Sequence, residues 1–194
     1  LFCENANAWI DPHRPVPTAI ITHGHADHAR WGMGHYYATP ETVAIMRHRI
    51  GESISVTEVP YYQSFQINQT QFTLLPAGHI LGSAQVMVEH KSHTTIITGD
   101  FKCSADRTVQ SFEHRPCDTL ILETTFGLPI YHWQPQKNII QSIERFWKSN
   151  QSKGIITVLY AYALGKAQRL LAELDATIGP MGAQAGRPAG WPEV

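Results

Sequence analysis

The chain has 194 residues, a formal net charge of −1 and 43% hydrophobic residues, which is long enough for one well-buried domain and the start of a second. This charge excludes a protein that holds nucleic acid by net charge alone, and no apolar run reaches the ~18 to 20 residues of a membrane-spanning helix. The three cysteines form no CxxC pair, which excludes a thiolate zinc finger and a disulfide framework and favours a reducing cytoplasm.

In the first half of the chain, turn residues separate short apolar runs. Residues 17–21 predict a buried strand, and the histidine-rich sequence THGHADH starts where this strand ends. The sequence Thr39-Pro40-Glu41 is typical of a helix start, and Gly51 of its end. Between residues 65 and 98, several β-rich runs predict a layered sheet, with a hairpin at HKSH.

The second half alternates strand and helix signals. Residues 118–123 predict a strand, and the apolar residues between 135 and 150 recur with a helical period, which predicts an amphipathic helix packed on the core. Residues 155–160 predict a strand and 165–174 a helix. The sequence after Gly179 is rich in glycine and proline without a period, so we expect an irregular tail and an incomplete chain.

The turn after the first strand carries a group of side chains that can bind metal: His23, His25, Asp27 and His28. Alternate residues of a loop can point into one pocket while neighbours serve different ions, so this spacing favours two metals over one. A zinc ion needs about four ligands, so others must come from elsewhere. His79 and Asp100 each follow a predicted strand, and strand ends converge at a sheet edge.

These motifs, together with Asp11 in WIDP, resemble the ligand series of the metallo-β-lactamase superfamily. ETTFG at 123–127 and YALGKAQRL at 162–170 resemble its β-CASP branch of DNA- and RNA-processing enzymes, most closely the ligase-associated DNA exonucleases, also called mRNA 3′-end-processing-factor-like proteins. The resemblance implies an α/β fold, with a metallo-β-lactamase αββα sandwich over residues 1–123. It further implies the start of a truncated β-CASP region over 124–178 and an irregular tail over 179–194.

The resemblance also implies two Zn²⁺ ions, or Mn²⁺ in their place. His23, His25 and His79 would bind the first ion, Asp27 and His28 the second, and Asp100 would bridge them. Later histidines of the β-CASP branch have no match after residue 178, so we expect an incomplete second site. The implied catalytic residues are Asp27, Asp100 and Glu123. Asp11 would orient a ligand histidine, and Lys166, at a predicted helix start, would contact phosphate.

The implied activity is hydrolysis of a nucleic-acid phosphodiester by a hydroxide held between two metal ions. A DNA exonuclease in repair is expected first, with DNA or RNA as substrate and a DNA ligase or helicase as partner. Three alternatives stay open: an RNA-processing nuclease, a hydrolase of small esters, thioesters or lactams, and a nucleic-acid-binding subunit without catalysis.

Simpler interpretations of single residues also stay open. Asp11 and Gly165-Lys166 are compatible with plain turns, and Glu123 with a cap. Exposed arginines are most often solvated, so Arg30, Arg47 and Arg49 need not contact a phosphate backbone. The cysteines Cys3, Cys103 and Cys117 are predicted to be small buried side chains.

Overall fold

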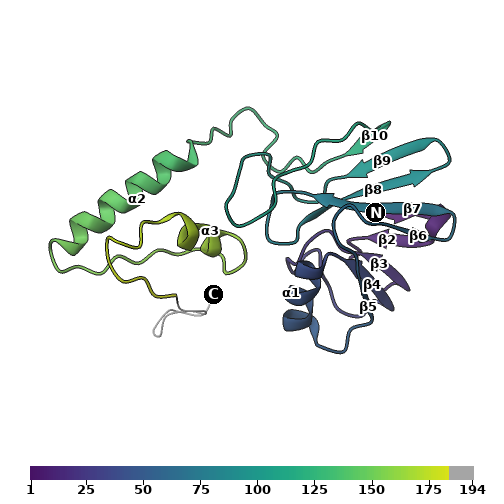
Figure 1. Ribbon diagram of the computed structural model, residues 1–194, viewed down its shortest axis with the longest axis horizontal. Helices are drawn as coiled ribbons and strands as arrows, with labels where there is room; N and C mark the ends of the chain where they lie inside the picture. The colour runs from purple at the N-terminus through teal and green to yellow at the C-terminus, as the bar shows by residue number, and fades with distance from the viewer. Residues whose placement is uncertain (184–194) are drawn as a thin grey trace. The chain divides into compact units, whose positions relative to one another are not determined.

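The computed structural model describes residues 1–183, which divide into two compact units, Leu1–Pro129 and a second that begins at Ile130. The first unit contains two five-stranded sheets (Figure 1). Sheet A has the order β1 (Phe2–Cys3), β2 (Ala8–Ile10), β3 (Thr18–Ile20), β4 (His35–Ala38) and β5 (Val56–Glu58). Sheet B has the order β10 (Thr119–Ile121), β9 (His93–Ile97), β8 (Ala84–His90), β7 (Thr70–Pro76) and β6 (Ser64–Ile67). A short 3-10 helix, η1 (Glu4–Ala6), joins β1 to β2.

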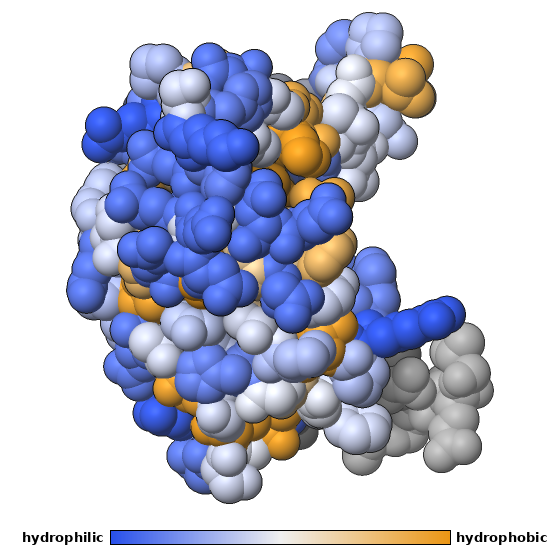
Figure 2. Space-filling view, turned by 90° about the vertical axis from the view of Figure 1, so that its right-hand side faces the viewer, coloured by the Kyte–Doolittle hydropathy of each residue, from blue (hydrophilic) through white to orange (hydrophobic). Residues whose placement is uncertain are grey.

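The directions of the strands bring four strand ends to one edge. In sheet A, β2 and β3 are parallel neighbours, so their carboxyl ends meet. In sheet B, β7 and β9 are both antiparallel to β8 and therefore run the same way. The predicted hairpin, with His90 opposite His93, closes the other end, and Figure 2 shows that the face on this side is mainly hydrophilic. Residues that follow β2, β3, β7 and β9 can therefore form a site.

A continuous apolar core joins the two sheets. Ile10 and Ile20 of sheet A pack against Phe72, Leu74 and Val86 of sheet B, and all are buried. Full burial of a side chain of this size stabilises the fold by roughly 1.5–3 kcal/mol, as an upper estimate. The core therefore fixes how one sheet lies on the other.

Helix α1 (Pro40–Ile50) covers the other face of sheet A. Thr39 is its N-cap and accepts a hydrogen bond from the Thr42 amide at 3.3 Å, and Gly51 ends it. Val43 and Met46 pack among the buried residues of β3 and β4. The predicted helix and both of its ends are confirmed.

The segment between β9 and β10 covers part of sheet B. The buried Gln85 side chain donates hydrogen bonds to the carbonyls of Pro76 and Glu113 at 3.0 and 2.7 Å. The Asp106 side chain is fully buried and accepts bonds from Lys102 Nζ at 2.8 Å and from Thr108. Burial raises the pKa of Asp106, but these hydrogen bonds outweigh it and hold the pKa well below its usual range.

The second unit contains the predicted helices, as α2 (Gln136–Gln151) and α3 (Lys166–Glu173). The expected core packing of α2 is wrong, because none of its residues is buried and Phe146 is 58% exposed. The strand predicted at 155–160 is also wrong. Within residues 1–183 this apolar segment pairs with no strand, and Ile156 is 86% exposed. Backbone groups buried in a strand need a neighbouring strand as partner.

Two further predictions concern composition. The cysteines form no disulfide, as expected, but the predicted burial is wrong: Cys103 is exposed, and Cys3 and Cys117 are half-buried. Across residues 1–183, no helix has both the length and the apolar character needed to cross a membrane. Residues 179–183 form neither helix nor strand, and the rest of the predicted tail lies outside the described residues. The assignment of 1–123 and 124–178 to two domains stays a prediction.

Candidate metal centre

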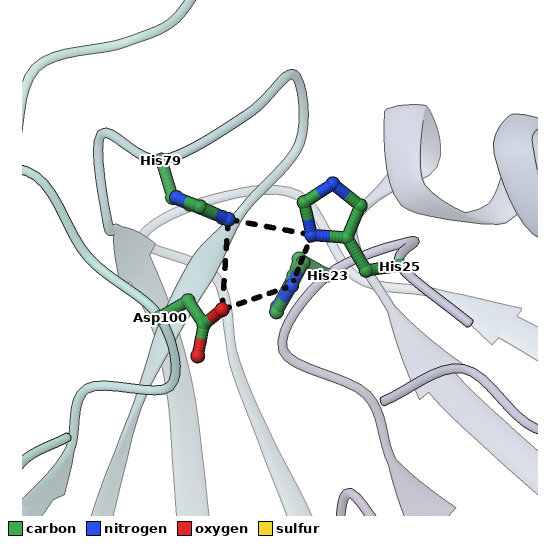
Figure 3. Close-up of side chains that lie close together, drawn as sticks. All are labelled: His23, His25, His79 and Asp100. Carbon is green, nitrogen blue, oxygen red and sulfur yellow. Dashed lines mark hydrogen bonds and ion pairs between the residues drawn. The ribbon is translucent and has the colours of Figure 1, made fainter. Parts of the chain in front are cut away.

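Four side chains converge at the shared edge of the two sheets (Figure 3). One nitrogen or oxygen atom from each of His23, His25, His79 and Asp100 lies within 4.8 Å of the others. His25 Nδ1 is 3.0 Å from His23 Nε2 and 3.3 Å from His79 Nε2. Asp100 Oδ2 is 3.8 Å from His23 Nε2 and 3.6 Å from His79 Nε2. The first two histidines follow β3 in sheet A, and the other two residues follow β7 and β9 in sheet B.

The spacing of these atoms fits a single bound metal ion. Zinc bonds to imidazole nitrogen and carboxylate oxygen are ~2.0–2.2 Å long, so neighbouring ligand atoms lie about 3.3–3.6 Å apart. Four of the six distances between these atoms range from 3.0 to 3.8 Å, and all six are within 4.8 Å. Three imidazoles and one carboxylate are also a donor set that zinc accepts. His23, His25, His79 and Asp100 can therefore hold one ion.

A second group of atoms lies on the other side of Asp100. His28 Nε2 is 3.5 Å from Asp100 Oδ1 and 3.7 Å from Asp27 Oδ2. Asp100 thus directs one oxygen toward His23 and His79 and the other toward His28. The Asp27 side chain is 70% exposed. The structure brings all six sequence-predicted ligands together, with Asp100 between the two groups, and within residues 1–183 the second group has fewer ligand atoms.

Asp11 lies behind both groups. It follows β2, and Thr22 follows the parallel neighbour β3, so the two residues meet. Asp11 accepts hydrogen bonds from the Thr22 amide at 2.8 Å and the Thr22 hydroxyl at 2.6 Å, and its Oδ2 is 2.8 Å from His28 Nδ1. Because the Thr22 hydroxyl donates to Asp11, its oxygen is available to accept from His23 Nδ1 at 3.0 Å. The Nε2 atoms of His23 and His28 are then left as acceptors that face the metal centre.

The charges of the centre match metal binding. Burial, and then repulsion from His28, His79 and His25, holds the pKa of His23 far below its usual value, so this imidazole is neutral. Neutral imidazole is the form that binds metal. Burial lowers the pKa of His28, but the Asp11 hydrogen bond and the carboxylates around it raise the pKa overall.

Asp100 is partly buried and lies near other carboxylates. Burial raises its pKa first, and the charges of Glu123 and Asp27 raise it further, against the opposing effect of His28 and His25. A cation beside Asp100 would lower this pKa, because opposite charges at short range favour the ionised carboxylate. The electrostatics of the centre therefore favour a bound dication.

Helix α1 supports the turn that carries the first ligands. Gly24 lies between His23 and His25, and a Cβ atom on it would lie only 2.6 Å from Ile45 Cγ2. Arg49 donates from Nη1 to the Gly24 carbonyl at 2.6 Å. Glycine is therefore needed at this position, and an arginine from the last turn of α1 fixes the peptide between two ligands.

The loops from sheet B are also held closely. Gly99, with φ of +57°, approaches Thr22 so closely that a Cβ atom would lie 2.7 Å from the threonine Cβ. The amide of Ala84 donates to the Thr22 carbonyl at 2.7 Å. On the His79 loop, the hydroxyls of Thr39 and Thr42 donate to the Gly82 carbonyl at 2.7 and 2.9 Å. The ligand positions are therefore fixed by contacts between the sheets and with α1.

The other predicted site residues have different surroundings. Glu123 is half-buried and near enough to affect the pKa of Asp100, and its Oε2 accepts from the Thr125 amide at 2.7 Å. It therefore caps a backbone amide of the following segment, as in the simpler interpretation, and also lies near the centre. Lys166, in the second unit, has its Nζ 5.0 Å from the centre of the Tyr162 ring. Its predicted phosphate contact stays a prediction.

Sequence reasoning missed two supporting residues. Thr22 directly precedes the first ligand, but a hydroxyl next to a histidine is too common to be a signal. Arg49 was considered as a contact for nucleic acid, whereas the structure places its guanidinium on the Gly24 carbonyl. Neither role was predictable, because each depends on a contact between distant elements.

No family model matches the chain. It is 33% identical to a "Probable DNA ligase" of Opitutus terrae over 90% of this chain and 17% of that protein. It is 27% identical to "Endoribonuclease YSH1" of Kluyveromyces lactis, over 82% of this chain and 26% of the relative. "Cleavage and polyadenylation specificity factor subunit 3" of Dictyostelium discoideum is 34% identical over 62% of this chain and 16% of its own.

The chain thus spans between about a sixth and a quarter of the length of these curated relatives. The ordered motifs, the pair of five-stranded sheets and the relatives agree with one another. The predicted α/β fold is confirmed. Within residues 1–129, α1 is the one α-helix beside the two sheets. The chain belongs to the metallo-β-lactamase superfamily, in the ligase-associated group of its β-CASP branch.

Proposed function

We propose that the chain is the metal-binding part of a hydrolase that cleaves phosphodiester bonds in nucleic acid. The observation that carries this proposal is the position of Asp100, with one oxygen toward His23 and His79 and the other toward His28. A carboxylate shared in this way suits a pair of ions, and two-metal sites are common among nucleases and phosphatases. When bound, the two ions would act as Lewis acids and lower the pKa of a water molecule.

The residues of the chain have separate parts in this scheme. His23, His25 and His79 would hold the first ion, Asp27 and His28 the second, and Asp100 both. Zinc suits these imidazole and carboxylate ligands, and manganese is the alternative. Asp11 orients the His28 ring directly and the His23 ring through Thr22. Glu123, near Asp100, is the proposed carboxylate that carries a proton during the reaction.

DNA is the proposed substrate, with an exonuclease role in repair. The relative that matches 90% of the chain is named as a probable DNA ligase, which supports activity beside a ligase that seals the processed end. The relatives named as endoribonucleases support the second candidate, an RNA-processing nuclease. The chain itself carries a net charge of only −1, so two bound dications would make the site attractive to a phosphate backbone.

The direct test uses purified protein loaded with Zn²⁺ or Mn²⁺ and end-labelled linear DNA, circular single-stranded DNA and RNA. We expect stepwise shortening of linear DNA, with circular DNA intact. His79→Gln and Asp100→Asn should abolish cleavage and reduce the amount of bound metal. The matched control is His35→Gln, since the His35 side chain contacts the hydroxyls of Ser55 and Thr57 and the Tyr37 ring rather than a proposed metal ligand.

Each alternative predicts another result. Cleavage of RNA but not DNA would favour the RNA-processing nuclease, and cleavage of circular DNA an endonuclease. Hydrolysis of a thioester or β-lactam with all nucleic acids intact would refute the proposal. The ligase connection is tested with a nick that carries an unpaired terminal nucleotide: wild-type protein, but not Asp100→Asn, should allow a DNA ligase to seal it.

A further inference from the structure

The loop that follows the metal-binding turn presents a tryptophan to solvent. Trp31 comes three residues after His28 and is 77% exposed, the largest exposed fraction among the large hydrophobic side chains of Leu1–Pro129. Within residues 1–183 its ring has no aromatic or cation–π partner. A single exposed apolar residue is ordinary, so the surroundings of Trp31 decide whether it has a function.

A buried tyrosine fixes the backbone around Trp31. The buried Tyr36 hydroxyl donates to the Arg30 carbonyl at 2.8 Å and accepts from the Met33 amide at 3.1 Å. One phenol thus ties together the two sides of the short segment that holds Trp31 and Gly32. Gly32 has φ of +92°, which permits the tight turn. The ring is therefore presented from a rigid base, and little conformational entropy would be lost on contact with a ligand.

Two arginines accompany this ring. Arg30 donates from Nε to the Asp27 carbonyl at 3.2 Å, which keeps its guanidinium beside the metal-binding turn. On the neighbouring loop, Pro15 lies against Gly32: a Cβ atom on the glycine would be 3.3 Å from Pro15 Cγ. Arg14, next to Pro15, is exposed, and its side chain makes no hydrogen bond or ion pair within residues 1–183. The loop that carries Trp31 follows His28, and the loop that carries Arg14 follows Asp11, so both loops start at the metal centre.

We propose that Trp31, Arg14 and Arg30 form a docking surface for a single strand of nucleic acid on its way to the metal centre. A base stacks on the Trp31 ring, and the guanidinium groups contact phosphates on either side. Aromatic rings and cations together are the usual elements of sequence-tolerant single-strand binding. The carboxylates at the starts of these two loops, Asp11 and Asp27, lie on the side of His28, at 2.8 and 3.7 Å from its ring nitrogens. This inference rests on the proposed function and adds how the substrate is held.

The test measures binding of a fluorescent single-stranded oligothymidylate, about ten nucleotides long, to metal-free protein, so that no cleavage occurs. Loss of one stacked base weakens binding by about 5- to 150-fold. We expect this loss for Trp31→Ala, recovery of most of the affinity for Trp31→Phe, and no change for the control Tyr62→Ala, whose side chain is 53% exposed in the same unit. Arg14→Met should reduce the slope of log Kd against log salt by about 1.

The outcomes separate this inference from the proposed function. Equal affinities of Trp31→Ala and wild type would overturn the docking surface, and so would a Trp31→Phe variant as weak as Trp31→Ala. If the wild type binds the strand and Trp31→Ala does not, but no metal-loaded protein cleaves any nucleic acid, the surface stands and the hydrolase proposal fails. Thermal unfolding of each variant shows whether the exposed substitution leaves the fold intact.

Discussion

Asp11 is the residue whose replacement tests the metal centre most sharply. Its carboxylate accepts two hydrogen bonds from Thr22 and contacts His28 Nδ1, all at 2.6–2.8 Å, and its side chain is 15% exposed. In Asp11→Asn, one acceptor oxygen becomes an N–H donor that faces a donor. The charge that stabilises the His28 orientation is lost as well, and hydrogen bonds to charged groups contribute about 1.5–3 kcal/mol each.

We expect Asp11→Asn to weaken metal binding by about 10- to 100-fold, the usual effect of removing such a supporting group. Both ions should be affected, because the same carboxylate orients His28 directly and His23 through Thr22. Thr22→Val provides the contrast. It leaves the buried His23 Nδ1 without an acceptor, which costs about 1–3 kcal/mol, but it keeps the Asp11–His28 contact. Only the first ion should then bind more weakly.

The assay is competition with a chromophoric zinc chelator, and the visible spectrum of the cobalt-substituted protein shows which site has changed. Urea unfolding of the metal-free variants separates a loss of metal affinity from a loss of fold. Two findings would contradict the scheme: wild-type affinity for both ions in Asp11→Asn, or equal loss at both sites in Thr22→Val.

Three more predictions concern the scaffold. Arg49→Met should weaken zinc binding by about tenfold in the same competition assay, whereas Arg47→Met, whose partner is an exposed glutamate, should not. Asp106→Asn should lower the free energy of unfolding by about 1–3 kcal/mol at pH 7. The folded-state pKa of Asp106 is depressed. Its contribution to the free energy of unfolding is therefore fully present above its unfolded pKa of about 3.9, and it is lost as the pH falls toward the folded-state value. The difference in stability between wild type and Asp106→Asn should therefore shrink at pH 3. Phe72→Ala, at a fully buried position in the core between the sheets, should cost about 3–5 kcal/mol in urea unfolding.

Local signals were enough to predict the elements that they determine. Thr39, Pro40 and Gly51 set both ends of α1 through capping chemistry that acts within a few residues. The six ligands could be proposed because each follows a short apolar run, and strand ends gather at sheet edges. The short strands β1, β2, β4 and β5 of sheet A were not predicted. Each has only two to four residues, and pairing with neighbours, rather than its own pattern, makes it a strand.

The wrong predictions have the opposite cause. Residues 155–160 have strong β propensity, and α2 has a clear apolar stripe, but within residues 1–183 neither is buried against a partner. Propensity describes what a segment can form, and packing decides what it does form. The relay from Asp11 through Thr22 to His23 was hidden for a related reason: it depends on the register of two parallel strands.

The ligands of the first ion come in equal numbers from the two halves of the sandwich, two histidines after β3 and two residues after β7 and β9. An ion held by all four residues would cross-link the two sheets. Any movement of one sheet along the other would then have to break coordination bonds as well as apolar contacts. Loading and stripping the metal should therefore change the mechanical stiffness of the whole first unit, and amides deep between the sheets, far from any ligand, should exchange their hydrogens more slowly in the loaded protein.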